Sequence, residues 1–271
     1  MHENFPIIGG GPAGAAAALA VLRNGGRPLI YEKSAFPRHK LCGEFFSPEA
    51  LPALEEIGAA EGFLRLKPAR VTHAELHFAR SSRRFSLPEP AYGLSRYAFD
   101  DFLLRLAVER SAELRHEQAT NPASPAVLAT GRSVASTRGR RTFGFKAHFS
   151  GPANNAVELY FFPGGYCGVN PIEGGKTNVC GLAREDLLGR HGFRVERLIE
   201  SLPRLKERLA PLAQENRWRV SGPLRYGLAH DAEDSLLRIG DAACFVDPFT
   251  GTGLLAAVQT GIWAGAALLR A

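Results

Sequence analysis

The sequence has 271 residues, enough for one large domain or two interleaved ones, and its 45% hydrophobic content can fill a sizeable core. The formal net charge of +6 comes without a helix-turn-helix, zinc-finger or base-stacking motif, so no nucleic-acid partner is expected. The basic surface is either a solvated face or an attraction for anionic headgroups and phosphates. Four cysteines without a Cys-x-x-Cys pair disfavour a zinc site or a disulfide framework and favour a reducing cytoplasm.

A short apolar run leads through the turn Gly9-Gly10-Gly11-Pro12-Ala13-Gly14 into a helix-forming stretch that reaches Leu22. A strand, a glycine-rich turn and a helix in this order are typical of a dinucleotide site. Gly9 permits the tight turn, Gly11 lets a pyrophosphate approach the backbone, and Gly14 lets the helix pack closely on the strand. The unpaired N–H groups at the helix start favour phosphate.

The second predicted strand, at residues 28–31, ends in Glu32 and Lys33. An acid about 20 residues beyond the glycines accepts hydrogen bonds from an adenosine ribose and disfavours a 2′-phosphate. Glu32 is therefore a candidate ribose ligand, the alternative being a solvated surface charge.

Two basic segments follow, Phe36-Pro37-Arg38-His39-Lys40-Leu41-Cys42-Gly43-Glu44 and the helix start Leu94-Ser95-Arg96-Tyr97-Ala98-Phe99-Asp100. Arg38 and Lys40 are either cofactor-facing cations or solvated loop charges. The guanidinium fork of Arg96 suits a pyrophosphate, but it equally suits an ion pair with Asp100 one helical turn later.

Near the end of the chain, the apolar run 236–239 is followed directly by Gly240 and Asp241. Residues 247–254, which read Asp-Pro-Phe-Thr-Gly-Thr-Gly-Leu, then lead into a long apolar helix. The alternative reading makes Asp241 a helix N-cap and the glycines ordinary turn residues. The helix contains Gly261-Ile262-Trp263-Ala264-Gly265, but Gln259 and Thr260 interrupt it, so a buried helix is expected rather than a membrane span.

Taken together, these segments resemble the para-hydroxybenzoate hydroxylase superfamily and, within it, the geranylgeranyl reductase family. The Pro-Arg-x-Lys-x-Cys-Gly run, the Arg-x-x-Phe-Asp helix start, Leu159–Tyr166 and Asn178–Gly181 carry the likeness. The resemblance implies bound FAD, with Asp241 on the ribityl chain, the following helix start at the flavin pyrimidine edge and Cys42 beside the isoalloxazine. It implies these FAD-binding residues: Gly9, Gly11, Pro12, Ala13, Gly14, Glu32, Lys33, Arg38, Lys40, Cys42, Gly43, Arg96, Gly240, Asp241, Pro248, Gly251, Thr252, Gly253 and Leu254.

The expected fold is α/β, with a Rossmann-like FAD-binding domain interleaved with an antiparallel-sheet substrate domain. We place the FAD lobe at residues 1–70, 95–135 and 236–271, and the substrate lobe at 71–94 and 136–235. Aromatic runs at 142–149 and 157–162 predict the sheet, one face of which would cover the flavin. A charged helical segment, 193–212, broken at Pro203, should cover the outer face.

The sequence departs from the family pattern at three points. The β-structure usual between Glu113 and Arg132 is missing, the chain ends at Ala271 soon after the flavin helix begins, and Pro6 stands where a β-branched strand residue is usual. These departures suggest a shortened member, so a non-catalytic flavin-binding protein is one alternative.

The leading functional prediction is an FAD-dependent oxidoreductase that reduces carbon–carbon double bonds of an isoprenoid or another hydrophobic small molecule. NAD(P)H or a ferredoxin would be the external electron donor, and Cys42 and Glu44 are candidate catalytic groups near the flavin. A monooxygenase of the same superfamily is the main alternative. A halogenase is less expected because no Trp-x-Trp-x-Ile-Pro segment occurs. A cytoplasmic protein, with peripheral contact to a membrane, fits this reading.

Overall fold

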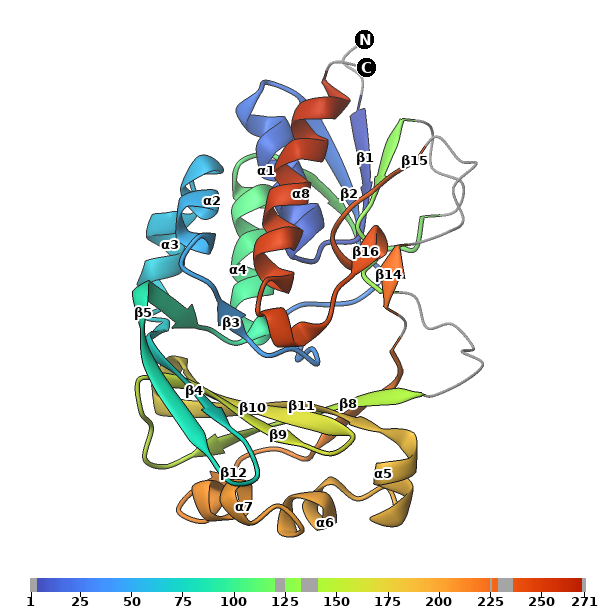
Figure 1. Ribbon diagram of the computed structural model, residues 1–271. Coiled ribbons are helices and arrows are strands. Elements are labelled where there is room, and N and C mark those ends of the chain that lie inside the picture. Colours follow the sequence, from blue (N-terminus) through green and yellow to red (C-terminus); the bar gives the residue numbers. More distant parts are fainter. Residues whose placement is uncertain (1–3, 120–124, 133–140, 225, 229–235, 270–271) are drawn as a thin grey trace.

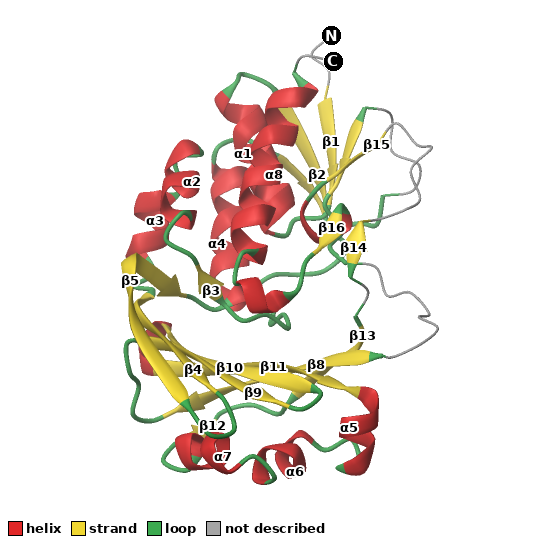
Figure 2. Ribbon diagram, in the orientation of Figure 1, coloured by secondary structure: helices red, strands yellow, loops and turns green. Residues whose placement is uncertain are grey.

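The computed structural model describes residues 4–119, 125–132, 141–224, 226–228 and 236–269 (Figure 1). It confirms the predicted α/β fold, in which a parallel sheet backed by helices lies over a second, mostly antiparallel sheet (Figure 2).

The parallel sheet has five strands among the described residues, in the order β15-β7-β1-β2-β6, and all of its pairings are parallel. Parallel sheets are covered by their connecting helices, and here α1, α4 and α8 form one layer beside the strands (Figure 1). The strands are β1 (Asn4–Ile8), β2 (Arg27–Tyr31), β6 (Glu113–Arg115), β7 (Ala126–Leu128) and β15 (Leu236–Arg238), and the helices of this lobe are α1 (Pro12–Arg23), α2 (Ala50–Glu56), α3 (Ala60–Arg65), α4 (Arg96–Glu109) and α8 (Gly253–Leu268).

Helix α8 packs directly against α1, as expected for a buried helix. A Cβ atom at Gly261 would lie 2.4 Å from the Ala13 carbonyl oxygen, and one at Gly265 would lie 2.6 Å from that of Ala17. The Gly-x-x-x-Gly spacing therefore serves close packing on an alanine-rich helix. No helix among the described residues has the length and apolar character needed to cross a bilayer.

Pro6 is accommodated in β1 although the strand lies inside the sheet. The pairing of β1 with β7 begins only at Ile7, so the missing N–H of Pro6 removes no bond on that side. Between β6 and β7, the described residues contain no strand, in agreement with the missing segment, and residues 120–124 lie outside the described part.

The larger sheet contains nine strands among the described residues, in the order β12-β8-β11-β10-β9-β4-β5-β3, with β13 also pairing with β8. All pairings are antiparallel except that of β4 with β9. The strands are β3 (Phe45–Phe46), β4 (Ala69–His77), β5 (Ser82–Gly93), β8 (Thr142–Ser150), β9 (Ala156–Phe162), β10 (Gly165–Ile172), β11 (Lys176–Arg184), β12 (Ala213–Gln214) and β13 (Arg219–Pro223). A separate two-stranded ribbon pairs β14 (Gly227–Leu228) with β16 (Cys244–Phe245).

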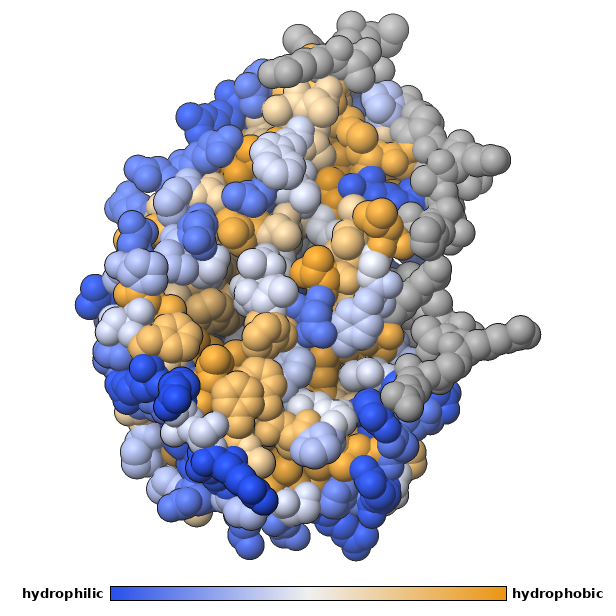
Figure 3. Space-filling model, in the orientation of Figure 1, coloured by the Kyte–Doolittle hydropathy of each residue, from blue (hydrophilic) through white to orange (hydrophobic). Residues whose placement is uncertain are grey.

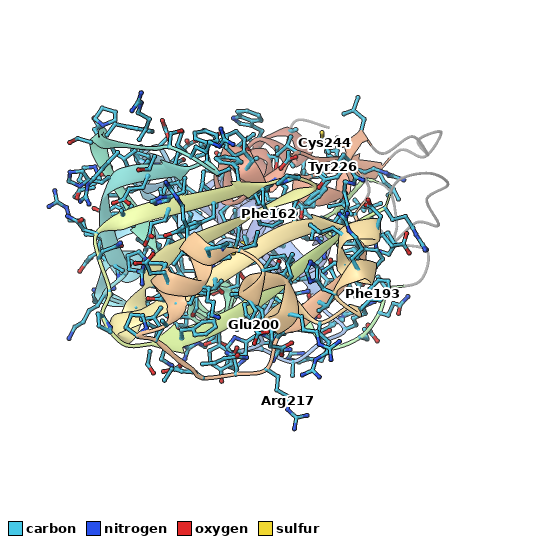
Figure 4. The ribbon with its side chains drawn as sticks, turned by 60° about the horizontal axis from the view of Figure 1, so that its bottom comes forward. Phe162, Phe193, Glu200, Arg217, Tyr226 and Cys244 are labelled. Atoms are coloured by element: carbon cyan, nitrogen blue, oxygen red, sulfur yellow. The ribbon has the colours of Figure 1, made fainter. Side chains whose placement is uncertain are left out.

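Three short helices cover the outer face of the larger sheet: α5 (Glu185–Arg190), α6 (Val195–Glu200) and α7 (Pro203–Leu209). Figure 4 shows them crossing the strands, while Arg217 points away from the molecule. Pro203 is the first residue of α7, where its missing N–H costs no helical bond, so the predicted break lies at the right position. Leu198 and Leu205 of these helices belong to the same hydrophobic core as Phe145 and Val179 of the sheet.

The other face of the larger sheet is turned toward the parallel-sheet lobe (Figure 1). Glu173, in the short η1 turn (Glu173–Gly175), accepts a hydrogen bond of 2.7 Å from the Ser95 N–H at the start of α4. Strand β3 extends from the 36–44 loop into the larger sheet through β5. The two lobes are thus joined by a polar contact at the start of α4. The residue ranges given above for the FAD lobe and the substrate lobe stay a prediction.

Candidate functional site

A cavity of about 790 Å³ lies between the two sheets. Its walls come from both ends of the chain: the turn after β1, the end of β2, the 38–45 loop, the start of α4, the inner face of the larger sheet, and residues 241–257. The carboxyl ends of the parallel strands open onto it, which is where α/β sheets bind ligands.

Most of the predicted site residues line this cavity. Those that do are Gly9, Gly11, Pro12, Ala13, Glu32, Lys33, Arg38, Lys40, Cys42, Gly43, Glu44, Arg96, Asp241, Pro248, Gly251, Gly253 and Leu254. Gly14, Gly240 and Thr252 do not line it. Gly14 packs on the turn, where a Cβ atom would lie 1.8 Å from the Gly9 carbonyl oxygen, and Gly240 adopts a φ of 56° against Ala13.

Three of the lining glycines have no packing reason within the protein to be glycine. A Cβ atom at Gly11, Gly43 or Gly253 would meet no protein atom within 4 Å, and none of the three has a positive φ. Side chains at these positions would instead project into free space beside the cavity. The residues present therefore fit a large ligand that approaches the backbone at three separate points, as FAD would.

Glu32 is fixed at the end of β2. Its Oε2 accepts a hydrogen bond from Gly10 N–H (2.9 Å) and its Oε1 one from Ser34 N–H (2.8 Å), and the residue is only 5% exposed. These bonds tie the acid to the glycine-rich turn rather than leave it as a solvated surface charge. A ribose there would meet a carboxylate already oriented by two backbone amides.

Arg38 and Lys40 face the cavity. Arg38 donates to Ser34 Oγ (2.9 Å) and pairs with Glu32 (3.3 Å), but its Nε is buried without a partner among the described residues. Burial and the nearby charges of Arg38 and Arg96 lower the pKa of Lys40. An anionic ligand would relieve both conditions, because it would supply the missing acceptor and the opposing charge.

Arg96 forms the ion pair with Asp100 that was the alternative to a pyrophosphate contact. Its guanidinium makes a two-pronged pair with Asp100, with Nε 2.5 Å from Oδ1 and one terminal nitrogen 2.7 Å from Oδ2. Burial opposes the charged form of Arg96, but Asp100 outweighs it and raises the pKa above its ordinary value; the Cys42 side chain adds to this. The paired guanidinium still lines the cavity.

Asp241 presents a carboxylate to the cavity with no hydrogen-bond partner among the described residues. The residue is exposed at the cavity, but the surrounding walls desolvate its carboxylate and raise its pKa, while the charges of Arg96 and Arg132 oppose the rise. Asp241 therefore does not act as a helix N-cap, and its oxygens remain available to accept hydrogen bonds from a hydroxylated ligand chain.

The segment after Asp241 brings a helix start to the cavity. Asp247 accepts a hydrogen bond from Phe249 N–H (3.0 Å) at the short η3 helix (Pro248–Thr250), and Gly251 then adopts a φ of 68° before α8 begins at Gly253. With Gly253 open to the cavity, the first N–H groups of a 16-residue helix lie at its wall. Such a helix start stabilises negative charge on a ligand.

The Cys42–Gly43 turn is held by the larger sheet. Asn178 of β11 donates from Nδ2 to the carbonyl oxygens of Gly43 (2.8 Å) and Cys42 (3.3 Å). The Cys42 sulfur accepts a hydrogen bond from the Glu44 N–H (3.3 Å) and lines the cavity. Cys42 is thus a half-buried thiol in a fixed loop, on the wall where the resemblance places the flavin ring.

Glu44 is completely buried, with a left-handed φ of 54°. Its Oε1 accepts the Arg96 N–H (2.7 Å) and pairs with Lys146, and its Oε2 lies 2.7 Å from His148 Nε2. Burial alone would raise the pKa of Glu44, but the His148 hydrogen bond and the Lys146 charge outweigh it and hold the pKa below its ordinary value. These contacts favour the ionised carboxylate, and the predicted catalytic role of Glu44 stays a prediction.

Several cavity or wall residues were not predicted from the sequence. Lys146 and His148 lie in an aromatic strand, where they looked like ordinary alternating positions, and only the fold brings them to Glu44. Arg132 and Tyr166 also line the cavity. Tyr166 donates to Asp247 Oδ1 (2.9 Å), which links the larger sheet to η3. The Gly131-Arg132 turn that follows β7 was the one signal that could have indicated Arg132.

No protein-family model matches the chain. Among curated proteins, it is 27% identical over 311 residues to digeranylgeranylglycerophospholipid reductase 2 of Methanopyrus kandleri, covering 98% of this chain and 76% of that protein. It is 24% identical over 321 residues to conditioned medium factor receptor 1 of Dictyostelium discoideum, covering 97% of this chain but only 62% of that protein. Flavin-dependent halogenases also occur among the relatives.

Among solved structures, a triple mutant of the flavin-dependent brominase Bmp2 superposes with a TM-score of 0.85 over 98% of this chain and 79% of that one, at 20% identity. At this identity, the likeness shows the fold, and it agrees with the predicted para-hydroxybenzoate hydroxylase-like architecture. The resemblance predicted from the sequence is confirmed: the chain is similar to the geranylgeranyl-reductase-like FAD oxidoreductases.

Proposed function

We propose that the protein is an FAD-dependent reductase of carbon–carbon double bonds in an isoprenoid or similarly hydrophobic small molecule. The observation that carries this proposal is one cavity whose upper wall holds the dinucleotide motifs and whose lower wall is an apolar sheet. The likeness to a digeranylgeranylglycerophospholipid reductase, which covers 98% of this chain and 76% of that protein, supports the choice of substrate class.

The residues of this chain have separable tasks in that reaction. Gly11 and the start of α1 would receive the pyrophosphate, Glu32 the adenosine ribose, and Asp241 the ribityl chain. The start of α8 would face the pyrimidine edge of the ring, where its N–H groups favour the reduced, negatively charged form. Bound and reduced FAD supplies the hydride for the double bond.

The second hydrogen of the product enters as a proton, and the groups around the cavity suggest its proposed source. Glu44 is held ionised by Lys146 and His148, and Cys180, the other cavity thiol, has its pKa raised to about 12 by burial and by Cys42. Cys42 or water remains the proposed donor, because Cys42 combines a place on the cavity wall with partial exposure.

The experiment starts with the purified, FAD-loaded protein under anaerobic conditions. NADH, NADPH and reduced ferredoxin are each tested for bleaching of the flavin absorbance, and geranylgeranyl substrates are then analysed by mass spectrometry. A product two mass units heavier per reduced bond supports the proposal. Bound FAD that every donor leaves oxidised, or reduced enzyme that leaves every isoprenoid unchanged, would contradict it.

A monooxygenase or halogenase activity is the second candidate, and the halogenase relatives and the brominase-like fold favour it. Both activities begin with a reduced flavin, but they consume O2, whereas the reductase does not require it. Oxygen consumption that rises with an aromatic substrate, together with an oxygenated or halogenated product, would favour this candidate over the reductase.

A further inference from the structure

Gly168 lies at the centre of the larger sheet, where glycine is unfavourable. It is in β10, hydrogen-bonded between β9 and β11, opposite Leu159 on one side and Cys180 on the other. Glycine inside a strand adds no packing and costs conformational entropy on folding. A glycine at this position therefore calls for a reason outside the strand itself.

The protein has room for a side chain at Gly168. A Cβ atom there would lie 3.4 Å from the Cys180 carbonyl oxygen and 3.6 Å from Leu159 Cδ2, both ordinary contact distances, and φ is not positive. Neighbouring glycines differ: a Cβ atom at Gly165 would lie 2.2 Å from the Leu182 carbonyl oxygen, and one at Gly181 would lie 2.4 Å from Phe145 Cζ. Those two are required by packing, and Gly168 is not.

The missing side chain of Gly168 leaves space in the cavity. Alternate residues of β10 face opposite sides: Cys167 and Val169 are fully buried in the core under α5–α7, whereas Tyr166, Gly168 and Asn170 line the cavity. Leu159 and Cys180 flank Gly168 across the strands and also line the cavity. A side chain at residue 168 would therefore project from the floor of the cavity.

The lining around Gly168 indicates the class of molecule that this space takes. Val157, Leu159, Ala74, Leu87 and Phe249 are apolar and belong to four separate segments of the chain. Of the two polar neighbours of Gly168 on the same strand face, Tyr166 already donates its hydroxyl to Asp247, which leaves Asn170 to meet a ligand. Asn170 is 3% exposed, and its Oδ1 has no hydrogen-bond donor among the described residues.

Aromatic side chains lie beside the part of the cavity wall that Phe249 forms. Phe78 stacks on Phe161 with ring centroids 5.1 Å apart, and Phe161 meets Phe249 at 5.6 Å. Phe78 and Phe249 are 42% and 47% exposed. Hydrophobic surface gathers across the middle of this face, between the helices of the upper lobe and the lower sheet (Figure 3).

We propose that the space above Gly168 is the substrate compartment, and that this glycine sets its depth for an elongated apolar molecule carrying one hydroxyl group. The hydroxyl would donate to Asn170 Oδ1, and the apolar chain would lie along Leu159 and Val157 toward Phe249. The inference rests on the function proposed above, and it names the residue that determines which substrates fit.

The test compares Gly168→Ala and Gly168→Val with the FAD-loaded wild type. Farnesol, an isoprenoid alcohol, is the probe in titration calorimetry, FAD affinity is measured by flavin fluorescence, and thermal unfolding reports stability. Because the site has room, Gly168→Ala should keep or raise the melting temperature. FAD affinity should stay within about twofold, while farnesol affinity falls in Gly168→Ala and by about tenfold or more in Gly168→Val.

Two glycines provide matched controls. Gly189 of α5 is exposed, and a Cβ atom there would come no closer than 3.9 Å to Phe193, so Gly189→Ala should leave FAD and farnesol binding unchanged. Gly181→Ala should lower the melting temperature because of the Phe145 clash. A purely structural role for Gly168 would make Gly168→Ala behave like Gly181→Ala.

Loss of FAD in the Gly168 variants would overturn the inference, because it would assign the glycine to the cofactor site. Unchanged farnesol affinity in Gly168→Val, or destabilisation of Gly168→Ala, would also overturn it. So would a wild-type protein that does not bind farnesol. The proposed function fails separately, when wild-type enzyme binds farnesol and FAD but no donor reduces the flavin or no isoprenoid is converted.

Discussion

Lys146 of β8 and Glu44 of the 38–45 loop form an ion pair in which the side chains are 2% and 0% exposed. The pair joins the larger sheet to the loop that carries Cys42, and Lys146 also donates to the Lys40 carbonyl oxygen at 3.0 Å. Glu44 in turn accepts the Arg96 N–H, so the start of α4 is tied to the same contact. One buried carboxylate therefore positions two walls of the cavity.

Breaking this pair from one side should be costly. Lys146→Met leaves Glu44 as a buried charge with only His148 and the Arg96 N–H as partners, and we expect a loss of about 3–5 kcal/mol in the free energy of unfolding. In the double variant Glu44→Gln/Lys146→Met the uncompensated charge is gone, so part of that loss should be recovered. Urea unfolding of the four proteins in the double-mutant cycle measures the coupling. A double variant as unstable as the sum of the singles would exclude a strong ion pair.

Acid should remove the stabilisation that Glu44 provides. Its pKa is lower in the folded protein than in the unfolded chain, where it is about 4.3. The stabilisation is therefore complete above the unfolded pKa and is lost as pH falls through that value toward the folded pKa. The stability difference between wild type and Glu44→Gln, measured by urea unfolding, should shrink from pH 6 to pH 3. A difference that is constant over this range would show that Glu44 is not held ionised.

Gly11→Val should abolish FAD binding without unfolding the protein. No protein atom lies within 4 Å of a Cβ atom at this position, so the added side chain projects only into ligand space. We expect FAD affinity to fall by about 100-fold or more, equal to roughly 2.8 kcal/mol. Flavin fluorescence titration measures the affinity, and circular dichroism checks the fold. A variant that stays yellow through purification would refute the cofactor assignment.

Gly9→Val provides the contrast to this variant. Gly9 has a φ of 108°, and a Cβ atom there would lie 2.4 Å from the Ala129 carbonyl oxygen of the adjacent chain segment. We expect a marked loss of thermal stability in Gly9→Val, together with poor FAD binding. The two glycines of one motif thus separate a ligand requirement from a folding requirement.

Cys42→Ser should keep FAD and change turnover. The sulfur lines the cavity and accepts one hydrogen bond from Glu44 N–H, which a hydroxyl can also accept, so FAD affinity should stay within about threefold. Turnover should fall by about tenfold or more, equal to roughly 1.4 kcal/mol. Steady-state kinetics with the active electron donor gives the result. Kinetics identical to those of wild type would reduce Cys42 to a packing residue.

The α8–α1 contact predicts opposite results for two positions on one helix. Gly261→Leu forces a side chain against Ala13 and Ala16 and should cost about 1–3 kcal/mol of stability or more. Trp263→Ala, at a residue that is 64% exposed, should change stability by less than about 0.5 kcal/mol. Thermal and urea unfolding compare the two. Equal losses would show that α8 does not pack by the glycine face.

The sequence by itself determined the cofactor half of the protein. The glycine turn, Glu32 and the Asp241 segment are local patterns, because a strand end, a tight turn and a helix start need only neighbouring residues to form a phosphate and ribose site. The helix break at Pro203 and the burial of α8 were predictable for the same reason, since the missing N–H of proline and the polar interruption at Gln259 act within one segment.

Only the tertiary structure decided how the larger sheet builds its wall of the cavity. Glu44 and Lys146 are 102 residues apart in the sequence, and nothing near either residue indicates the other. Strand register placed Lys146 and His148 on the inner face of β8, and the same register left Gly168 on the cavity floor while Gly181 was required by packing. Long-range pairing determines which face a residue occupies, so a local pattern can identify a strand without identifying its role.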